Sequence, residues 1–117
     1  AAVGLTTQQA REQKIDFLTG RFPFTASGRA LTLGETEGLI KVLAEKSSKK
    51  IIGVHIIGPR ASDLIPEAAL AMKMGATISD LAKTIHPHPT LSEALKEAAL
   101  DAIGEAIHLG KKIRRAG

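Results

Sequence analysis

Two apolar runs joined by a short polar segment constrain the fold of this chain more than any other feature of its sequence. They lie in residues 37–45 and 50–57, and residues 47–49 between them can close a β-hairpin. The second run is apolar almost throughout, which predicts a central strand that is covered on both faces. His55 interrupts that run, and we expect it to be a partly buried structural residue rather than a metal ligand.

The remaining pattern predicts at least one more strand and several helices. In the first part of the chain we expect a helix over 6–14, a strand over 15–24 with Pro23 at an edge, and a loop at Ser27 and Gly28. After the hairpin we expect a helix that is capped by Ser62 and Asp63, has Pro66 near its first turn and ends at Gly75. A short helix over 77–84 and a last helix from Leu91 to a stop at Gly110 complete the pattern. Met72 and Met74 are expected to fill the core, whereas Glu97 lies mostly off the apolar stripe of the last helix. Strands followed by helices predict an α+β domain, with an antiparallel sheet of about three to four strands packed with about four helices.

The length and composition of the chain bound its organisation. At 117 residues it is expected to be one domain over residues 1–110, followed by a basic tail over 111–117. The absence of cysteine excludes disulfides, zinc ribbons and thiol nucleophiles, and it fits a reducing compartment, so we expect a cytoplasmic location. No apolar run approaches the roughly 18 residues of a membrane span. Because the chain begins at Ala1 rather than Met, it is expected to be processed or excised from a longer protein.

The positive charge of the chain has two interpretations. The formal net charge is +4 and the sequence pI is about 9.6. Basic residues gather at Lys111, Lys112, Arg114 and Arg115, which would suit a nucleic-acid or phosphate partner, or simply a solvated tail after a helix. Trp and Tyr are absent and aromatics make up 3% of the chain, which favours the solvated tail and no nucleic-acid partner. A basic, non-catalytic binding module remains the alternative function.

The residues with the most chemical potential surround the start of the last helix. His86, His88 and Glu93 are close in sequence, but Pro87 between the histidines tends to point their rings apart, so no metal site is expected. Thr90 and Glu93 have the spacing of a capping box, which would explain both residues without any activity. From spacing alone, this capping interpretation is favoured.

The same residues also allow a catalytic pair. A carboxylate that accepts one imidazole N–H fixes the tautomer of the ring and makes the other nitrogen a better base, so Glu93 could activate His88. Capping and orienting need not exclude each other, because a carboxylate has two oxygens. However, the chain lacks a thiol and a glycine-rich cofactor cradle, so it is incomplete as an independent enzyme.

Several ordered segments of the chain resemble a known family. Residues 86–93, HPHPTLSE, resemble the motif of the flavin-dependent disulfide oxidoreductases, and of their dihydrolipoamide dehydrogenase branch above all. The likeness to the C-terminal dimerisation domain of that family continues in four further segments, at residues 22–30, 34–38, 52–61 and 67–71. Together the segments span nearly the whole chain, roughly Val3 to Ile107, and are far more specific than the histidine and glutamate alone.

The resemblance implies that the chain is one domain of a larger enzyme and contributes only part of its active site. In that family the intact homodimer oxidises dihydrolipoamide and passes electrons through a disulfide and FAD to NAD. By motif match, His88 is the acid–base group at the partner subunit's flavin and disulfide, Glu93 holds it, and Pro89 follows it against the flavin through a cis peptide. FAD and NAD would be bound by N-terminal domains, with an acyltransferase core of a 2-oxo acid dehydrogenase complex as a possible further partner. The chain alone is expected to bind no cofactor and to be inactive.

Two features leave the branch of the family open. Pro87 stands where the family commonly has a small residue, which would stiffen the loop. Related disulfide reductases share the His-Pro and Glu arrangement, so an interface domain of another flavin disulfide reductase is the nearest alternative. The Ser-Glu context of residues 92–93 and the segment 58–61, GPRA, favour the lipoamide branch.

Overall fold

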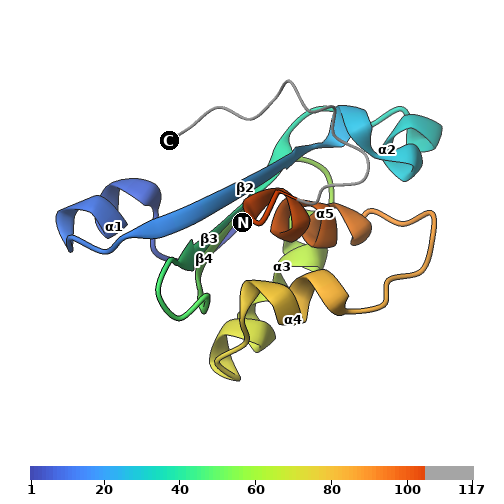
Figure 1. The fold of residues 1–117 in the computed structure, drawn as a ribbon. Coiled ribbons are helices and arrows are strands. Elements are labelled where there is room, and N and C mark those ends of the chain that lie inside the picture. The colour runs from blue at the N-terminus through green and yellow to red at the C-terminus, as the bar shows by residue number, and fades with distance from the viewer. Residues whose placement is uncertain (105–117) are drawn as a thin grey trace.

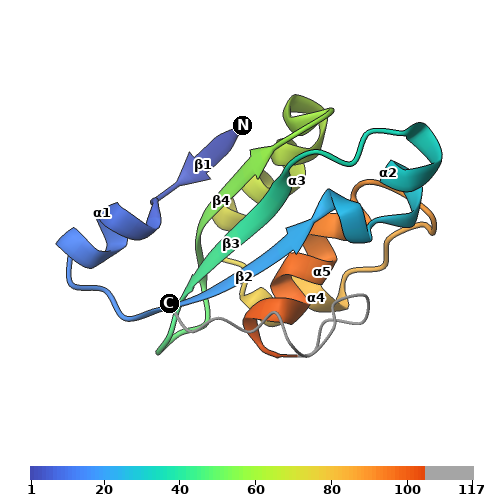
Figure 2. The ribbon, with the colours of Figure 1, turned by 90° about the horizontal axis from the view of Figure 1, so that it is seen from above.

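The fold is built on a four-stranded antiparallel sheet (Figure 1), and its strand order is β1-β4-β3-β2 (Figure 2). The structure, a computed structural model, describes residues 1–104; the predicted basic tail and the predicted stop at Gly110 lie outside these residues. The strands are β1 (Ala2–Gly4), β2 (Phe17–Pro23), β3 (Leu39–Glu45) and β4 (Ile51–Ile57). The predicted α+β class with an antiparallel sheet is confirmed.

The central hairpin is formed by β3 and β4, as the two apolar runs predict. Val42 pairs with Val54 and Ile40 with Ile56, and all four side chains are buried on the same face of the sheet. β4 is a central strand between β1 and β3, but its predicted coverage on both faces is wrong at its far end, where Ile57 is 71% exposed.

His55 has the structural role that its position predicts. It is half-buried, and its Nε2 atom lies 2.9 Å from the carbonyl oxygen of Leu5, just after β1. A carbonyl oxygen only accepts hydrogen bonds, so the Nε2–H group of His55 donates this one. The bond ties the segment after β1 to the middle of β4.

Three helices cover one face of the sheet (Figure 2). α5 packs against β2 and β3, α3 packs against β4, and α4 packs against α5. The helices in chain order are α1 (Thr7–Glu12), α2 (Gly28–Leu33), α3 (Ala61–Lys73), α4 (Ile78–Lys83) and α5 (Glu93–Ala102), with a short 3₁₀ turn η1 (Phe24–Ala26) before α2. The largest fully buried side chains between these layers include Phe22, Phe24, Ile40, Ile56, Ile78 and Leu95. No helix within residues 1–104 is both long and apolar enough to cross a membrane.

The helix α2 stands where the sequence predicts a loop. Ser27 caps it, because its hydroxyl accepts the backbone N–H of Ala30 at 3.2 Å, and Gly34 ends it in the left-handed conformation at φ 69°. A helix of six residues contains too few turns for an apolar period to stand out. The prediction of a loop is therefore wrong at Gly28, the first residue of α2, whereas Ser27 does lie outside regular structure, between η1 and α2.

The bounds of α3 also differ from the predicted ones. The helix begins at Ala61 after Arg60, which has φ 58°, so Ser62 and Asp63 lie within its first turn and do not cap it. Pro66 is consequently the sixth residue of the helix and falls in its second turn. At the other end Gly75 does stop the helix, with φ 68°. Met74 beside it is 75% exposed, so its predicted place in the core is wrong.

The helix α5 is shorter than its apolar stripe predicts. It ends at Ala102, and Gly104 follows with φ 78°, a left-handed conformation that glycine adopts without strain. The predicted continuous helix to Gly110 is therefore wrong. Glu97, predicted to lie off the apolar stripe, is in fact only 4% exposed.

A capping box starts α4 and predicts a pH dependence of stability. The backbone N–H of Thr77 donates to Oδ2 of Asp80 at 2.8 Å, and the backbone N–H of Asp80 donates to the Thr77 hydroxyl at 3.2 Å. The first of these bonds holds the pKa of the Asp80 carboxyl below its ordinary value. A carboxyl with a lowered folded-state pKa stabilises the fold above its unfolded-state pKa, and this contribution is lost as the pH falls through the folded-state pKa.

We therefore expect Asp80→Asn to destabilise the chain near neutral pH and to have a smaller effect below a pH of about 3. The asparagine oxygen can still accept from Thr77, so the variant removes mainly the charge of the cap. Urea-unfolding midpoints of the two proteins at both pH values measure the difference. An equal loss of stability at the two pH values would contradict the assignment.

Candidate functional site

The predicted pair of His88 and Glu93 is formed in the structure. His88 lies in the His-Pro loop, defined here as residues 84–92 between α4 and α5, and Glu93 is the first residue of α5. Nδ1 of His88 lies 2.9 Å from both carboxylate oxygens of Glu93. A carboxylate only accepts, so the proton of neutral His88 resides on Nδ1, and Nε2 is the nitrogen that can take up a further proton. The His88 side chain is 69% exposed and that of Glu93 is 22% exposed.

Glu93 also shapes the start of α5, although not through a complete capping box. Its Oε1 atom accepts the backbone N–H of Thr90 at 2.8 Å, which is the reach-back half of the predicted motif. The other half is missing, because the Thr90 hydroxyl donates to the carbonyl of Pro87 at 2.7 Å, and Ser92 occupies the cap position in a helical conformation. One carboxylate thus orients the imidazole and holds the loop together.

The two histidines of the loop face different partners, as Pro87 predicts. Nε2 of His86 lies 2.7 Å from Oε2 of Glu67 on α3, and its Nδ1 lies 3.0 Å from the carbonyl oxygen of Thr84. The peptide bond between His88 and Pro89 is cis, as the resemblance implies. No group of three potential metal ligands occurs within residues 1–104.

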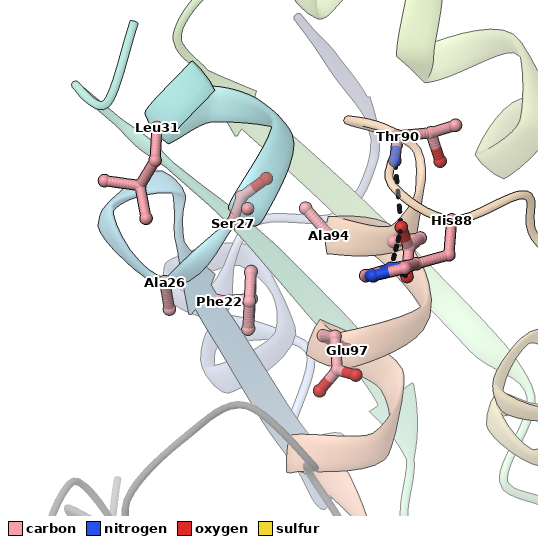
Figure 3. Close-up of a pocket in the computed structure, with 10 residues that line it drawn as sticks. Phe22, Ala26, Ser27, Leu31, His88, Thr90, Ala94 and Glu97 are labelled. Carbon is pink, nitrogen blue, oxygen red and sulfur yellow. Dashed lines mark hydrogen bonds and ion pairs between the residues drawn. The ribbon is translucent and has the colours of Figure 1, made fainter. Parts of the chain in front are cut away.

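An open pocket of about 210 Å³ adjoins the pair (Figure 3). On one side lie Phe22, Ser27 and Leu31, contributed by β2 and by the start and middle of α2; on the other lie His88 and Thr90 of the loop. Sequence reasoning missed the α2 side of this pocket. The serine at position 27, three residues before Ala30, was the available signal for a helix start there.

The geometry of the site defines what the chain can contribute chemically. It presents, on an α+β domain, an exposed imidazole whose tautomer is fixed by a carboxylate, an arrangement suited to proton transfer with a group that approaches from outside. The chain has no cysteine of its own. These features define an α+β domain that carries a carboxylate-held imidazole at its surface.

The comparison with protein families assigns the domain. A family model described as "Pyridine nucleotide-disulphide oxidoreductase, dimerisation domain" matches residues 1–99. The chain belongs to this family.

Individual relatives agree with the family. The chain is 56% identical over 109 residues to a dihydrolipoyl dehydrogenase of Thermus scotoductus, covering 93% of this chain and 24% of that protein. It is 53% identical over 106 residues to a dihydrolipoyl dehydrogenase of Halobacterium salinarum, covering 91% of this chain and 22% of that protein. The chain therefore spans about a quarter or less of the length of these curated relatives.

Solved structures share the fold. The structure resembles LpdA from Mycobacterium tuberculosis with a TM-score of 0.78 and 30% identity, over 84% of this chain and 21% of that one. It resembles the HOCl-induced flavoprotein disulfide reductase RclA from Escherichia coli with a TM-score of 0.80 and 28% identity, over 84% of this chain and 22% of that one. The predicted resemblance to a flavin disulfide oxidoreductase dimerisation domain is thus confirmed.

Proposed function

We propose that, within a homodimeric dihydrolipoyl dehydrogenase, this domain supplies His88 and Glu93 as an acid–base pair to the partner subunit's flavin–disulfide site. The observation that carries the proposal is the geometry of His88. Its Nδ1 atom is held at 2.9 Å by both oxygens of Glu93, while its side chain is 69% exposed. An imidazole fixed in this way on a dimerisation domain is suited to a reaction centre on another subunit.

The proposed chemistry is proton transfer during NAD-dependent oxidation of dihydrolipoamide. Nε2 of His88 takes the proton from a substrate thiol, so that the thiolate can attack the enzyme's disulfide, and the negative charge of Glu93 stabilises the resulting imidazolium. The same nitrogen then returns the proton to a departing thiolate or to water. FAD and NAD, held by other domains, would supply the acceptors for the two electrons of the reduced disulfide.

The residues present fit a flavin that the partner carries rather than one bound by this chain. His88 and Pro89 are both exposed, so this edge of the loop can lie against a flat ring presented from outside. The glycine fingerprints that cradle FAD and NAD are absent from the sequence, so those groups would be held by other domains of the polypeptide. The isolated chain is accordingly expected to be inactive.

Exposed apolar side chains support the proposed homodimer. Leu70 is 62% exposed, Met74 75% and Ile85 92%, and a hollow of about 270 Å³ between α3 and α4 is lined partly by Leu70 and Met74. Large apolar groups gathered in this way mark surfaces that a partner covers. The acyltransferase core of a 2-oxo acid dehydrogenase complex remains a further expected partner, and the cytoplasmic location stays a prediction.

The degree of similarity to relatives favours one class of substrate. Other flavoprotein disulfide reductases share the fold at 28% identity, so the fold alone allows an interface domain of a different reductase. Identities of 46–56% to dihydrolipoyl dehydrogenases favour dihydrolipoamide.

A hybrid dimer tests the cross-subunit role of His88. We prepare the full-length protein that carries this domain in two inactive forms, one with His88→Ala and one with its redox cysteines replaced by serine. In a hybrid, the subunit with intact cysteines receives His88 from its partner, so one of the two sites is complete. Random mixing should therefore restore about a quarter of the activity of the unsubstituted enzyme, because about half of the dimers are hybrids with one working site each.

The alternative arrangement predicts a different result. If His88 served the site of its own subunit, neither site of the hybrid would be complete, and dihydrolipoamide-dependent NAD reduction would stay at background. Co-purification of the two forms through different affinity tags confirms that hybrids are present, so background activity in confirmed hybrids would refute the proposal.

A further inference from the structure

We propose that Glu67 and His86 are positioning residues for the reaction, because their partly buried contact fixes the His-Pro loop to α3 and thereby sets the place of His88. The inference rests on the proposed function, since its readout is the activity that His88 supports. It concerns a second histidine–carboxylate pair, separate from the pair formed by His88 and Glu93.

The contact between Glu67 and His86 is short and largely shielded from solvent. Nε2 of His86 lies 2.7 Å from Oε2 of Glu67, and the side chain of His86 is only 5% exposed, compared with 33% for Glu67. The residues are 19 positions apart in sequence, so the contact joins two different parts of the fold. A polar contact excluded from water is stronger than the same contact at the surface.

Both ring nitrogens of His86 are engaged, which determines where its protons lie. Nδ1 lies 3.0 Å from the carbonyl oxygen of Thr84, which can only accept, so Nδ1 carries a proton. A further proton must then lie between Nε2 and the carboxyl group of Glu67. With the proton on either group, one hydrogen bond links the imidazole of His86 to the carboxyl group of Glu67. The ring therefore cannot turn without breaking its contacts with Glu67 and with the carbonyl of Thr84.

Fixing His86 also fixes His88. Pro87 between them has its φ angle locked by its ring, and it restricts the residue before it to extended conformations. The carbonyl of Pro87 accepts the hydroxyl of Thr90 at 2.7 Å, which closes the loop on its other side. Because Pro87 is stiff, fixing the ring of His86 also restricts the position of the His88 backbone.

The pair matters because the residues next to His86 in the loop lie at the surface. Ile85, Pro87, His88 and Pro89 are all exposed, whereas the ring of His86 is buried. Glu67 belongs to α3, which packs on β4, and Glu93 belongs to α5, which packs on β2 and β3. Contacts with α3 thus position the backbone of His88, and a contact with α5 orients its ring. The proposed catalytic geometry depends on both helices.

The test compares two substitutions of Glu67 in the full-length homodimeric enzyme. Glu67→Leu removes the hydrogen bond at similar volume. It should lower kcat for dihydrolipoamide by about tenfold or more, because small misplacements of a reacting group are costly. KM should stay within about twofold. Glu67→Gln should retain most of the activity, because its amide N–H can donate to Nε2 of neutral His86.

Matched variants separate positioning from general damage to the fold. Asp63→Asn changes another acidic residue of α3, which is exposed, and should leave kcat unchanged. His86→Ala removes the same contact from the loop side, so it should reproduce the loss seen with Glu67→Leu. The double variant should be no worse than either single variant, because both remove one interaction.

The outcomes distinguish this inference from the proposed function. If His88→Ala abolishes activity but Glu67→Leu and His86→Ala retain it fully, the positioning role is overturned and the proposed function stands. If Glu67→Gln is as impaired as Glu67→Leu, or if the effects of Glu67→Leu and His86→Ala add, the single hydrogen bond is not the cause. Should Glu67→Leu fail to fold, the kcat values of His86→Ala and Glu67→Gln are compared instead. A kcat that is low in His86→Ala and retained in Glu67→Gln supports the positioning role, and equal kcat values overturn it.

Discussion

Replacing His88 with alanine in the full-length enzyme should lower kcat for dihydrolipoamide by about 10² to 10⁴, the usual contribution of a positioned acid–base group. Thermal stability and dimer content should change little, because the side chain of His88 is 69% exposed. Steady-state rates of NAD reduction, with the melting temperature measured alongside, give both quantities. Full activity in a folded His88→Ala dimer would refute the catalytic role.

Glu93 provides the matched comparison for His88. Glu93→Gln keeps an oxygen that can accept from either Nδ1 of His88 or the backbone N–H of Thr90, but it removes the charge that stabilises the imidazolium. We expect a loss of kcat smaller than that of His88→Ala, together with a loss of stability on the order of 1 kcal/mol from the weakened helix start. If Glu93→Gln kept full activity, the orienting role of Glu93 would be wrong.

Replacing Gly20 with alanine should be strongly destabilising, costing about 3 kcal/mol or more of unfolding free energy. Gly20 lies in β2 where α5 crosses it, and an added Cβ would overlap the carbonyl oxygen of Ala98 and the backbone nitrogen of Ala102. Both of these are backbone atoms of the helix, so only a shift of α5 can relieve the overlap. Urea unfolding followed by circular dichroism measures the loss.

Gly28→Ala is the matched control for Gly20→Ala. An added Cβ at Gly28 meets nothing within 4 Å, and the residue is at the first position of α2, so the variant should be neutral or stabilising by about 0.4–1 kcal/mol. Equal losses for the two variants would show that the helix contact does not explain the effect. Because a shift of α5 also moves Glu93, Gly20→Ala should reduce the activity of any folded enzyme.

The local sequence pattern was sufficient to predict the β3–β4 hairpin and the contact between His88 and Glu93. The runs in residues 37–45 and 50–57 are long enough for their apolar character to dictate strands, and His88 and Glu93 are close enough in sequence that the loop brings them together. The identification of the family depended on ordered motifs across the chain, because the spacing of Thr90 and Glu93 alone favoured a helix cap. The structure contains half of that cap.

The features that sequence reasoning missed depend on contacts between distant segments. Nothing near His86 in sequence indicates Glu67, which reaches it from α3 across 19 positions. The early end of α5 follows from Gly104, a single residue whose left-handed conformation outweighs an apolar stripe that continues past it. The pocket beside His88 needed α2, whose six residues are too few to show a period.

The double engagement of Glu93 limits how the site can be redesigned or can diverge. The carboxylate that accepts the Nδ1–H of His88 also holds the turn into α5 through Thr90, so a substitution at position 93 changes the orientation of the imidazole and the start of the helix together. Residues that touch only one of these functions offer more freedom. Changes in the properties of this site should therefore arise from substitutions around the imidazole, with the glutamate itself retained.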